Sequence, residues 1–293
     1  MLPGMRAKPA IAIVGAGNFA SSLAPSLRRA GYAIETVVSR VDAGSLKRAR
    51  RVARDVGAVA CSTPPANLHS RVVWFCVPDS QIGHAADLLA DRINWKGRLA
   101  LHSSGALTSD ALQTLRQRGA SVGSVHPLMT FVAGSRPTLA GVPFAIEADR
   151  AAMRIARKII KDLGGRAYPI RKAEKAAYHA WGTFVSPLFT ALLATAERVA
   201  GLAGVPAKVA RSRAIPILLQ TLANYALLGA DAGFSGPLVR GDVETVKRHL
   251  RVLRSNRQAS DVYRALAMAS LHYLPVKNKQ ELEKTLHRGR RRS

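Results

Sequence analysis

The first part of the chain alternates short apolar runs with longer segments in which apolar positions recur at helical spacing. Apolar runs of strand length separated by amphipathic segments are typical of parallel sheets with helices on both faces. The pattern continues to about Ile170 and predicts a doubly wound α/β domain with a parallel sheet. The expected strands are 10–14, 32–38, 71–77, 98–101, 120–125, 142–146 and 166–170, and the clearest expected helices are 18–30 and 150–163.

The pattern changes after Lys172, where the strand-like runs end and helical spacing continues to about Tyr273. Stretches with glycine and proline at 201–206 and 229–237 are the expected breaks between helices. The sequence therefore predicts an all-α C-terminal domain behind the sheet domain. The expected divisions are 1–170 for the sheet domain, 171–276 for the helical domain and 277–293 for a basic tail that we expect to be disordered.

Small residues follow the first expected strand at the spacing G-x-G-x-x-A, in the segment Gly15-Ala16-Gly17-Asn18-Phe19-Ala20. A strand, such a turn and a helix form the phosphate-binding unit of dinucleotide-binding domains. In that unit Gly15 permits the sharp turn, Gly17 permits close approach of a pyrophosphate, and Ala20 permits close packing of the helix. The helix directs its N-terminal N–H groups at the phosphates. The alternative is a tight strand–helix turn with no ligand.

The second expected strand ends in Ser39 and Arg40, where NAD-binding domains usually carry an acidic residue for the ribose hydroxyls. A guanidinium and a hydroxyl instead suit the 2′-phosphate of NADP. Arg48 and Arg51 add positive charge on the next expected helix. We therefore expect NADP (NADPH) to be preferred over NAD. The alternative is that Arg40 is one more surface arginine in an arginine-rich chain.

Three further expected strands are also followed by polar residues. Because parallel strands end at one edge of a sheet, these residues are expected in one site. The proposed neighbours of the cofactor are Val77, Pro78 and Asp79, and the proposed ligands of a substrate carboxylate are Ser103, Ser104 and Gly105. His102 and His126 are candidate catalytic proton donors. The alternatives are that His126 holds a turn and that the serine loop only caps a helix.

Further candidates lie in the helical part. Lys175 and His179 are four residues apart and therefore share one face of a predicted helix. Either could be the catalytic donor to a substrate, and the alternative is a solvated lysine beside a packing histidine. Arg240 could bind an anionic group of a substrate or of a partner subunit, whereas Asp242 suits a helix N-cap. No group of residues has metal-ligand spacing, so no metal is expected.

The chain is strongly basic, with 44 Lys and Arg residues against 18 Asp and Glu residues and a formal net charge of +26. The basic residues are spread along the whole chain and are concentrated only at 287–292. This charge predicts nonspecific affinity for nucleic acid at low salt. Because no compact basic motif with aromatic residues is present, we do not expect nucleic-acid binding to be the function.

Cysteine content and hydropathy indicate where the protein works. The only two cysteines, Cys61 and Cys76, do not make a disulfide framework, which favours a reducing cytoplasm. The most apolar windows, 184–196 and 214–230, are too short or are interrupted by polar residues, so no membrane span is expected. The segments 184–196 and 214–228 are apolar around much of their circumference, which predicts a homodimer built on the helical domain.

Seven blocks of the sequence form a recognisable set, at 15–18, 39–40, 77–79, 102–107, 126–131, 178–180 and 236–242. In order and spacing they resemble the Rossmann-like proteins that carry a C-terminal domain of unknown function 2520 (DUF2520). These proteins are similar to pyrroline-5-carboxylate reductase, ketopantoate reductase and the 6-phosphogluconate dehydrogenase group. The resemblance implies an NADP-binding N-terminal domain and a helical C-terminal domain used for dimerisation. In β-hydroxyacid dehydrogenases a catalytic Lys and a substrate-binding Asn have the separation seen here between Lys175 and His179.

Together these observations predict a cytoplasmic NADP-dependent oxidoreductase that reduces a C=O or C=N bond of a small, carboxylate-bearing metabolite. The cofactor would carry out the hydride chemistry, while the protein supplies orientation, a proton and charge stabilisation. A non-catalytic NADP(H)-binding regulator or scaffold is the alternative. Turnover of nicotinamide would distinguish the two.

Overall fold

The computed structural model of the chain describes residues 8–64 and 67–287, and these form two compact units. Unit 1 ends at Thr183 and unit 2 begins at Phe184, so the division falls later than the expected boundary near Ile170. The physical reason is α6 (Lys175–Thr183), whose first residue donates hydrogen bonds to Ser104 and Ser124 of the sheet domain. The first helix after the last strand therefore belongs to unit 1.

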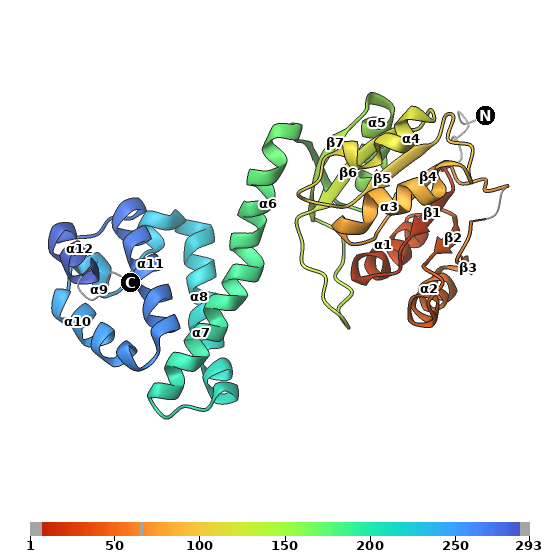
Figure 1. Ribbon diagram of the computed structural model, residues 1–293. Helices are drawn as coiled ribbons and strands as arrows, with labels where there is room; N and C mark the ends of the chain where they lie inside the picture. The colour runs from red at the N-terminus through yellow and green to blue at the C-terminus, as the bar shows by residue number, and fades with distance from the viewer. Residues whose placement is uncertain (1–7, 65–66, 288–293) are drawn as a thin grey trace, which may run out of the picture. The chain divides into compact units, whose positions relative to one another are not determined.

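Unit 1 is built on one eight-stranded sheet with the order β3-β2-β1-β4-β5-β6-β7-β8 (Figure 1). The first six strands run parallel, which confirms the predicted Rossmann-type α/β fold. The expectation of an all-parallel sheet was wrong at one edge, since β7 pairs antiparallel with β6 and β8 follows β7. No helix separates β6 from β7, and a parallel return needs a crossover connection. The strands are β1 Ile11–Val14, β2 Ile34–Val38, β3 Val59–Cys61, β4 Val72–Phe75, β5 Leu99–His102, β6 Ser121–Pro127, β7 Pro143–Ala148 and β8 Arg166–Pro169.

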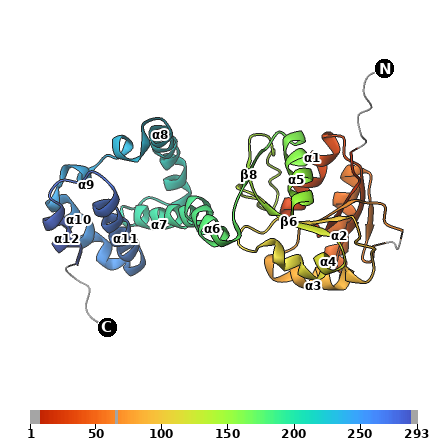
Figure 2. The ribbon, with the colours of Figure 1, turned by 90° about the horizontal axis from the view of Figure 1, so that it is seen from above.

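Helices cover both faces of this sheet, as the alternating pattern predicts (Figure 2). One apolar cluster joins α1, α2 and α5 to one face, and a second joins α3 and α4 to the other. The helices are α1 Asn18–Arg29, α2 Ala43–Val56, α3 Asp79–Ala90, α4 Gln113–Gln117 and α5 Arg150–Asp162, with short 3₁₀ turns at η1 Ser109–Leu112 and η2 Lys172–Glu174.

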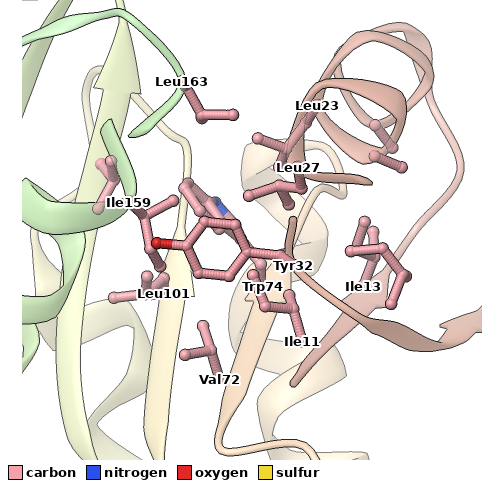
Figure 3. Packing of buried hydrophobic residues seen from close by; sticks show 14 of the residues in the cluster. Ile11, Ile13, Leu23, Leu27, Tyr32, Val72, Trp74, Leu101, Ile159 and Leu163 are labelled. Atoms are coloured by element: carbon pink, nitrogen blue, oxygen red, sulfur yellow. The ribbon is translucent and has the colours of Figure 1, made fainter. Parts of the chain in front are cut away.

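Tyr32 lies at the centre of the first cluster, between α1 and α5 (Figure 3). Its ring is fully buried, and its hydroxyl donates to Asp162 Oδ2 at 2.7 Å. Lys8 Nζ lies 2.8 Å from the same carboxylate and 4.8 Å from the centre of the Tyr32 ring. The Asp162 carboxylate therefore gives the buried hydroxyl of Tyr32 a hydrogen-bond partner, without which its burial would be costly.

Unit 2 is helical throughout its described residues, and no strand follows β8 in the described part of the chain. The expected breaks are present: α7 ends at Leu202, and Gly229, with φ +79° and ψ −178°, interrupts the helical geometry of α8. The elements are the π-helical η3 Phe184–Leu188, α7 Phe189–Leu202, α8 Ala207–Gly233, α9 Pro237–Arg240, α10 Val243–Val252, η4 Leu253–Ser255, α11 Arg257–Tyr273 and α12 Lys279–His287.

The expectation of a disordered tail over 277–293 was wrong for its first part. Lys279–His287 forms α12, which buries Leu282 and Leu286 against α10 and α11 in the apolar cluster of unit 2. The charges of this segment lie on the other face of an amphipathic helix, and such a helix needs only a narrow apolar stripe to dock. Residues 288–293 lie outside the described part.

The hydropathy of the helices bears on membrane insertion. Among the described residues, no single helix has the length and apolar content of a membrane span. The segments 172–202 and 207–240 meet that test only as a pair, with a bend of 117° between them.

Candidate functional site

Unit 1 has a topological switch point between β1 and β4. The chain continues from β1 toward one edge of the sheet and from β4 toward the other, so a crevice forms at the carboxyl ends of these two strands. A cavity of about 590 Å³ lies there. Several of the residues that line it are ones that the sequence predicts to bind a dinucleotide. Lining residues include Gly15, Ala16, Gly17, Ser39, Arg40 and Pro78.

Gly15 and Gly17 are glycines for different reasons. Gly15 has φ +98°, and a Cβ there would lie 2.6 Å from the carbonyl oxygen of Cys76, so the turn itself requires glycine. Gly17 has φ −77°, and a Cβ there would meet only the Cys76 oxygen, at 3.8 Å. The fold therefore has room for a side chain at Gly17. The bare backbone leaves a cradle that a Cβ would partly fill and that suits a close-approaching phosphate.

The N-terminus of α1 adjoins this cradle. Gly17 is the N-cap and provides no side-chain oxygen for the first N–H groups, and no acidic residue lies in the first turn. Such a turn can hold an anion. Asn18 Nδ2 donates to the carbonyl oxygen of Phe131 at 3.1 Å, and the rings of Phe19 and Phe131 pack edge to face at 5.0 Å. The segment after β6 therefore lies beside the start of α1.

A cationic end of the cavity follows β2. Arg40 Nη2 and Arg48 Nη2 both donate to Ser45 Oγ, at 3.3 and 3.0 Å. Asp42 caps α2 by accepting from the Ser45 N–H at 2.8 Å and pairs with Arg40 at 3.5 Å. Hydrogen bonds from Ser45 and the positive charges of Arg40 and Arg48 lower the pKa of the Asp42 carboxyl. Two guanidinium groups thus meet at the Ser45 hydroxyl, and Ser39 lines the same end of the cavity. An arginine after the second strand accommodates the 2′-phosphate in NADP-binding domains.

His102 fixes the loop after β5. Its Nδ1 accepts from the Ser104 N–H at 3.2 Å, so Nε2 carries the ring proton and donates to the carbonyl oxygen of Thr108 at 2.9 Å. The side chain is fully buried, and burial lowers the pKa of His102 to about 4. Both ring nitrogens are therefore engaged in holding the loop. This geometry differs from the expected role of proton donor to a substrate, because no ring nitrogen is left to reach one.

The serine hydroxyls of this loop are also used inside the protein. Ser104 Oγ donates to Asp79 Oδ2 at 2.7 Å, and Ser103 Oγ accepts from a buried indole N–H at 2.9 Å. The backbone N–H groups of Gly105 and Ala106 donate to no residue in the described part of the chain. Of the expected carboxylate-binding groups, the Ser104 O–H is therefore engaged, whereas the Ser103 O–H and the two loop amides donate to no described residue.

Lys175 lies behind the same loop, with only 1% of the residue exposed. Its Nζ donates to the carbonyl oxygen of Ser104 at 3.2 Å and to Ser124 Oγ at 2.8 Å, and Ser124 Oγ donates to the same carbonyl at 2.9 Å. Burial lowers the pKa of Lys175 to about 8, and the negative charges of Glu147 and Asp79 oppose that shift. The ammonium reaches the expected loop, but it lies inside the protein instead of facing a substrate.

His126 and His179 approach the loop from its open side. Nδ1 of His126 donates to the carbonyl oxygen of Ser103 at 2.9 Å, and burial lowers the pKa of His126. A Cβ on Gly105 would lie 2.9 Å from Nε2 of His126 and 2.5 Å from Cδ2 of His179, so both rings pack on the bare Gly105 backbone. The ring centres of the two histidines are 6.0 Å apart, and His179 is exposed. The structure thus brings together two of the separately expected candidates, His126 and His179.

The sequence analysis missed several residues of this region. Ser124 and Glu147 are buried polar residues in β6 and β7, and the signal was a polar residue inside an otherwise apolar run. Tyr178 packs edge to face with His126 and with Trp181, at 6.0 and 5.6 Å between ring centres. The region therefore combines loop amides, two imidazoles and an aromatic wall.

Two remaining candidates have clear positions. Asp79 lies in the first turn of α3, and its carboxylate accepts a hydrogen bond from Ser104. Val77 and Pro78, which precede it, line the cavity. Arg240 is the last residue of α9 in unit 2. Asp242 caps α10 as expected, accepting from the N–H and the hydroxyl of Thr245 at 3.0 and 2.7 Å.

Family models match both parts of the chain: a Rossmann-like domain matches residues 4–127, and DUF2520, a domain of unknown function, matches residues 142–270. The chain joins a Rossmann-like domain to a DUF2520 domain. This confirms the resemblance seen in the sequence. The glycine motif lies in the first match, whereas Lys175 and His179 lie in the second, which begins within the sheet of unit 1. No curated protein matches the sequence.

Solved structures support the same fold. A protein from Bacteroides fragilis that is provisionally named an NADP oxidoreductase has 23% identity and a TM-score of 0.72, over 89% of this chain and 97% of that one. A reductive aminase from Aspergillus terreus in complex with NADPH has 16% identity and a TM-score of 0.61, over 94% and 99%. A pyrroline-5-carboxylate reductase from Coxiella burnetii has 16% identity and a TM-score of 0.56, over 96% and 97%.

Proposed function

We propose that the protein is a cytoplasmic NADP-dependent oxidoreductase that reduces a C=O or C=N bond of a small, carboxylate-bearing metabolite. The observation that carries the proposal is the cavity at the switch point. It joins an open glycine cradle at Gly17, which the fold itself does not require, to a cationic end at Arg40 and Arg48. A dinucleotide with an additional phosphate is the ligand that uses both ends.

The choice of NADP over NAD rests on Ser39, Arg40, Ser45 and Arg48. The side chain of Arg40 is 74% exposed, so its guanidinium can turn onto a phosphate. An acidic residue that binds ribose hydroxyls would oppose this, but Asp42 is already engaged as the cap of α2. The NADPH bound by the similar reductive aminase from Aspergillus terreus agrees with this choice.

The nicotinamide and the substrate would lie at the carboxyl ends of β5 and β6. When bound, the nicotinamide supplies or accepts a hydride. The free amides of Gly105 and Ala106 suit a substrate carboxylate, and the imidazoles of His126 and His179 lie beside them. His179 is exposed, and an imidazole can take up and release a proton in contact with solvent, so this side chain is suited to deliver the proton. The names of the similar solved proteins, a reductive aminase and a pyrroline-5-carboxylate reductase, agree with reduction of C=N bonds.

A regulator that binds NADP(H) without turnover is the second candidate, since the cavity alone supports binding. The two are separated by incubating the protein with NADPH and a panel of keto acids and cyclic imines and following the absorbance of the reduced nicotinamide. Consumption with one class of substrate supports the enzyme, whereas tight binding without consumption across the panel supports the regulator.

Binding itself is tested with Gly17→Ala. The added methyl group fits the fold, so we expect native thermal unfolding together with NADPH binding weakened by at least about tenfold, the cost of a misplaced charge-assisted contact. Gly201→Ala is the matched control, because Gly201 is a helical glycine of unit 2 with no atom within 4 Å of the added carbon. Native affinity in Gly17→Ala, measured by fluorescence titration, would show that the dinucleotide does not use this cavity.

A further inference from the structure

We propose that Lys175 is a positioning residue: its buried ammonium clamps the loop after β5 to β6 and keeps His126 neutral, with Nδ1–H toward Ser103 and the Nε2 lone pair toward Gly105. The inference rests on the proposed function in one respect only, namely that His126 contacts the substrate. It gives Lys175 a role other than contact with the reacting atoms.

The clamp follows from the geometry of the ammonium group. Lys175 Nζ donates to the carbonyl oxygen of Ser104, and it donates to Ser124, whose hydroxyl in turn donates to the same carbonyl. These three groups form a closed triangle of hydrogen bonds between α6, the loop and β6. Because Lys175 is 1% exposed, no face of the ammonium group is left for a substrate.

The tautomer of the neutral His126 ring follows from its own partner. The carbonyl oxygen of Ser103 can only accept, so Nδ1 of His126 must carry a proton, and the neutral ring then has its lone pair on Nε2. Nε2 lies against Gly105, and no described residue is hydrogen-bonded to it. A neutral His126 therefore offers a hydrogen-bond acceptor on the open side of the loop.

Charges on the surrounding elements decide whether the ring stays neutral. Burial contributes most to the lowered pKa of His126, and the positive charges of Lys175 on α6 and of protonated His179 act in the same direction. Asp79 on α3 opposes them. Lys175 also lowers the pKa of His102 on β5, while Glu147 on β7 faces Lys175 itself. Lys175 stays mostly protonated at neutral pH, because burial lowers its pKa only to about 8.

The unprotonated Nε2 of a neutral His126 determines which substrate groups can bind beside it. An acceptor pairs with an O–H or N–H donor, so the reacting group that contacts His126 should be a hydroxyl, an amine or a protonated imine. An unprotonated carbonyl oxygen would face a lone pair and be disfavoured there. The clamp therefore favours substrates that bring a proton to this position.

The test follows the imidazoles by NMR in the full chain labelled with ¹³C and ¹⁵N at histidine, without substrate. His126→Gln assigns the His126 signal among the eight histidines. We expect the Nδ1–H tautomer in the native protein and titration of His126 below the ordinary histidine range. In Lys175→Met the titration should move to higher pH, and in Lys175→Arg it should remain low. Lys172→Met is the control, because Lys172 is exposed and pairs with Asp110 at the surface.

Each outcome decides the inference. An unchanged His126 titration in a folded Lys175→Met protein, or an Nε2–H tautomer in the native protein, would overturn it. The tautomer is read from the native chain, so the second criterion holds even if Lys175→Met does not fold. Binding of NADPH is measured on the same samples. Absence of binding in the native protein would count against the proposed function and would leave the result on His126 unaffected.

Discussion

Replacing Lys175 by methionine should make unit 1 more stable at neutral pH, although Lys175 donates two hydrogen bonds. Methionine is unbranched and only one heavy atom shorter than lysine, and it removes a charge that the native fold holds away from water. Ser124 Oγ continues to donate to the carbonyl oxygen of Ser104, so the loop carbonyl keeps a partner in the variant. The opposite expectation, loss of stability, would apply if the two hydrogen bonds outweighed the cost of burying the charge.

The magnitude follows from the pKa of Lys175, which falls from 10.5 to about 8 on folding. At about 1.36 kcal/mol for each pKa unit, the charged form costs about 3 kcal/mol relative to the neutral amine. Between about pH 8 and 10.5 the unfolded chain binds more protons than the native chain, so the native free energy of unfolding rises with pH. The penalty is fully present below about pH 8 and is relieved toward pH 10.5. Lys175→Met lacks this dependence, so its advantage, up to about 3 kcal/mol at pH 7, should shrink over that window.

Urea unfolding followed by tryptophan fluorescence measures this effect in unit 1 alone, because Trp74, Trp95 and Trp181 all lie there. The free energy of unfolding is compared between native and variant proteins at pH 7 and pH 10. Lys172→Met, whose exposed ion pair contributes about 0–1 kcal/mol, serves as the control. A variant that is destabilised at pH 7, or a difference that stays constant between the two pH values, would refute the reasoning.

Two further predictions concern the cofactor and assembly. Arg40→Asp reverses the charge at the end of β2, so NADPH affinity in isothermal titration should fall about ten- to a hundredfold while NADH binding changes less; equal losses for both cofactors would contradict the assignment to the 2′-phosphate. We also propose a homodimer built on unit 2, since α7 and α8 bury no residue and α8 exposes Ile217 and Leu227 at 68% and 84%. Light scattering at micromolar concentration should give a dimer mass that Leu227→Glu reduces, and a monomer mass for the native chain would remove the proposal.

Much of the fold was predictable because its rules are local. The turn at Gly15 needs a positive φ and has no room for a Cβ, and both needs are visible as glycine in the sequence. The direction of β7 was not predictable, because an apolar run has the same pattern in a parallel and an antiparallel strand. Likewise, the charges of 277–287 concealed the narrow apolar stripe of Leu282 and Leu286 that docks α12.

The sequence predicted which residues lie at the candidate site better than it predicted what each side chain does there. The spacing of Lys175 and His179 correctly places both near the loop after β5, since residues four apart share a helix face. It does not show that one side chain is buried and the other exposed, because that depends on where β6 and the loop lie in space. For the same reason the sequence does not distinguish His102, which holds the loop with both nitrogens, from His126, which keeps Nε2 free of described partners.

The burial of Lys175 is the observation that joins stability to the proposed reaction. The ammonium makes no ion pair within 4 Å among the described residues, and its nearest partners are a neutral carbonyl and a neutral hydroxyl. A buried charge that costs about 3 kcal/mol and lacks a paired anion is poorly explained by folding alone. Its position explains it better, because the same charge fixes the amides of the loop and disfavours a second cation on His126. If Lys175→Met is more stable and also shifts the titration of His126, the lysine is retained for the site at the expense of the fold.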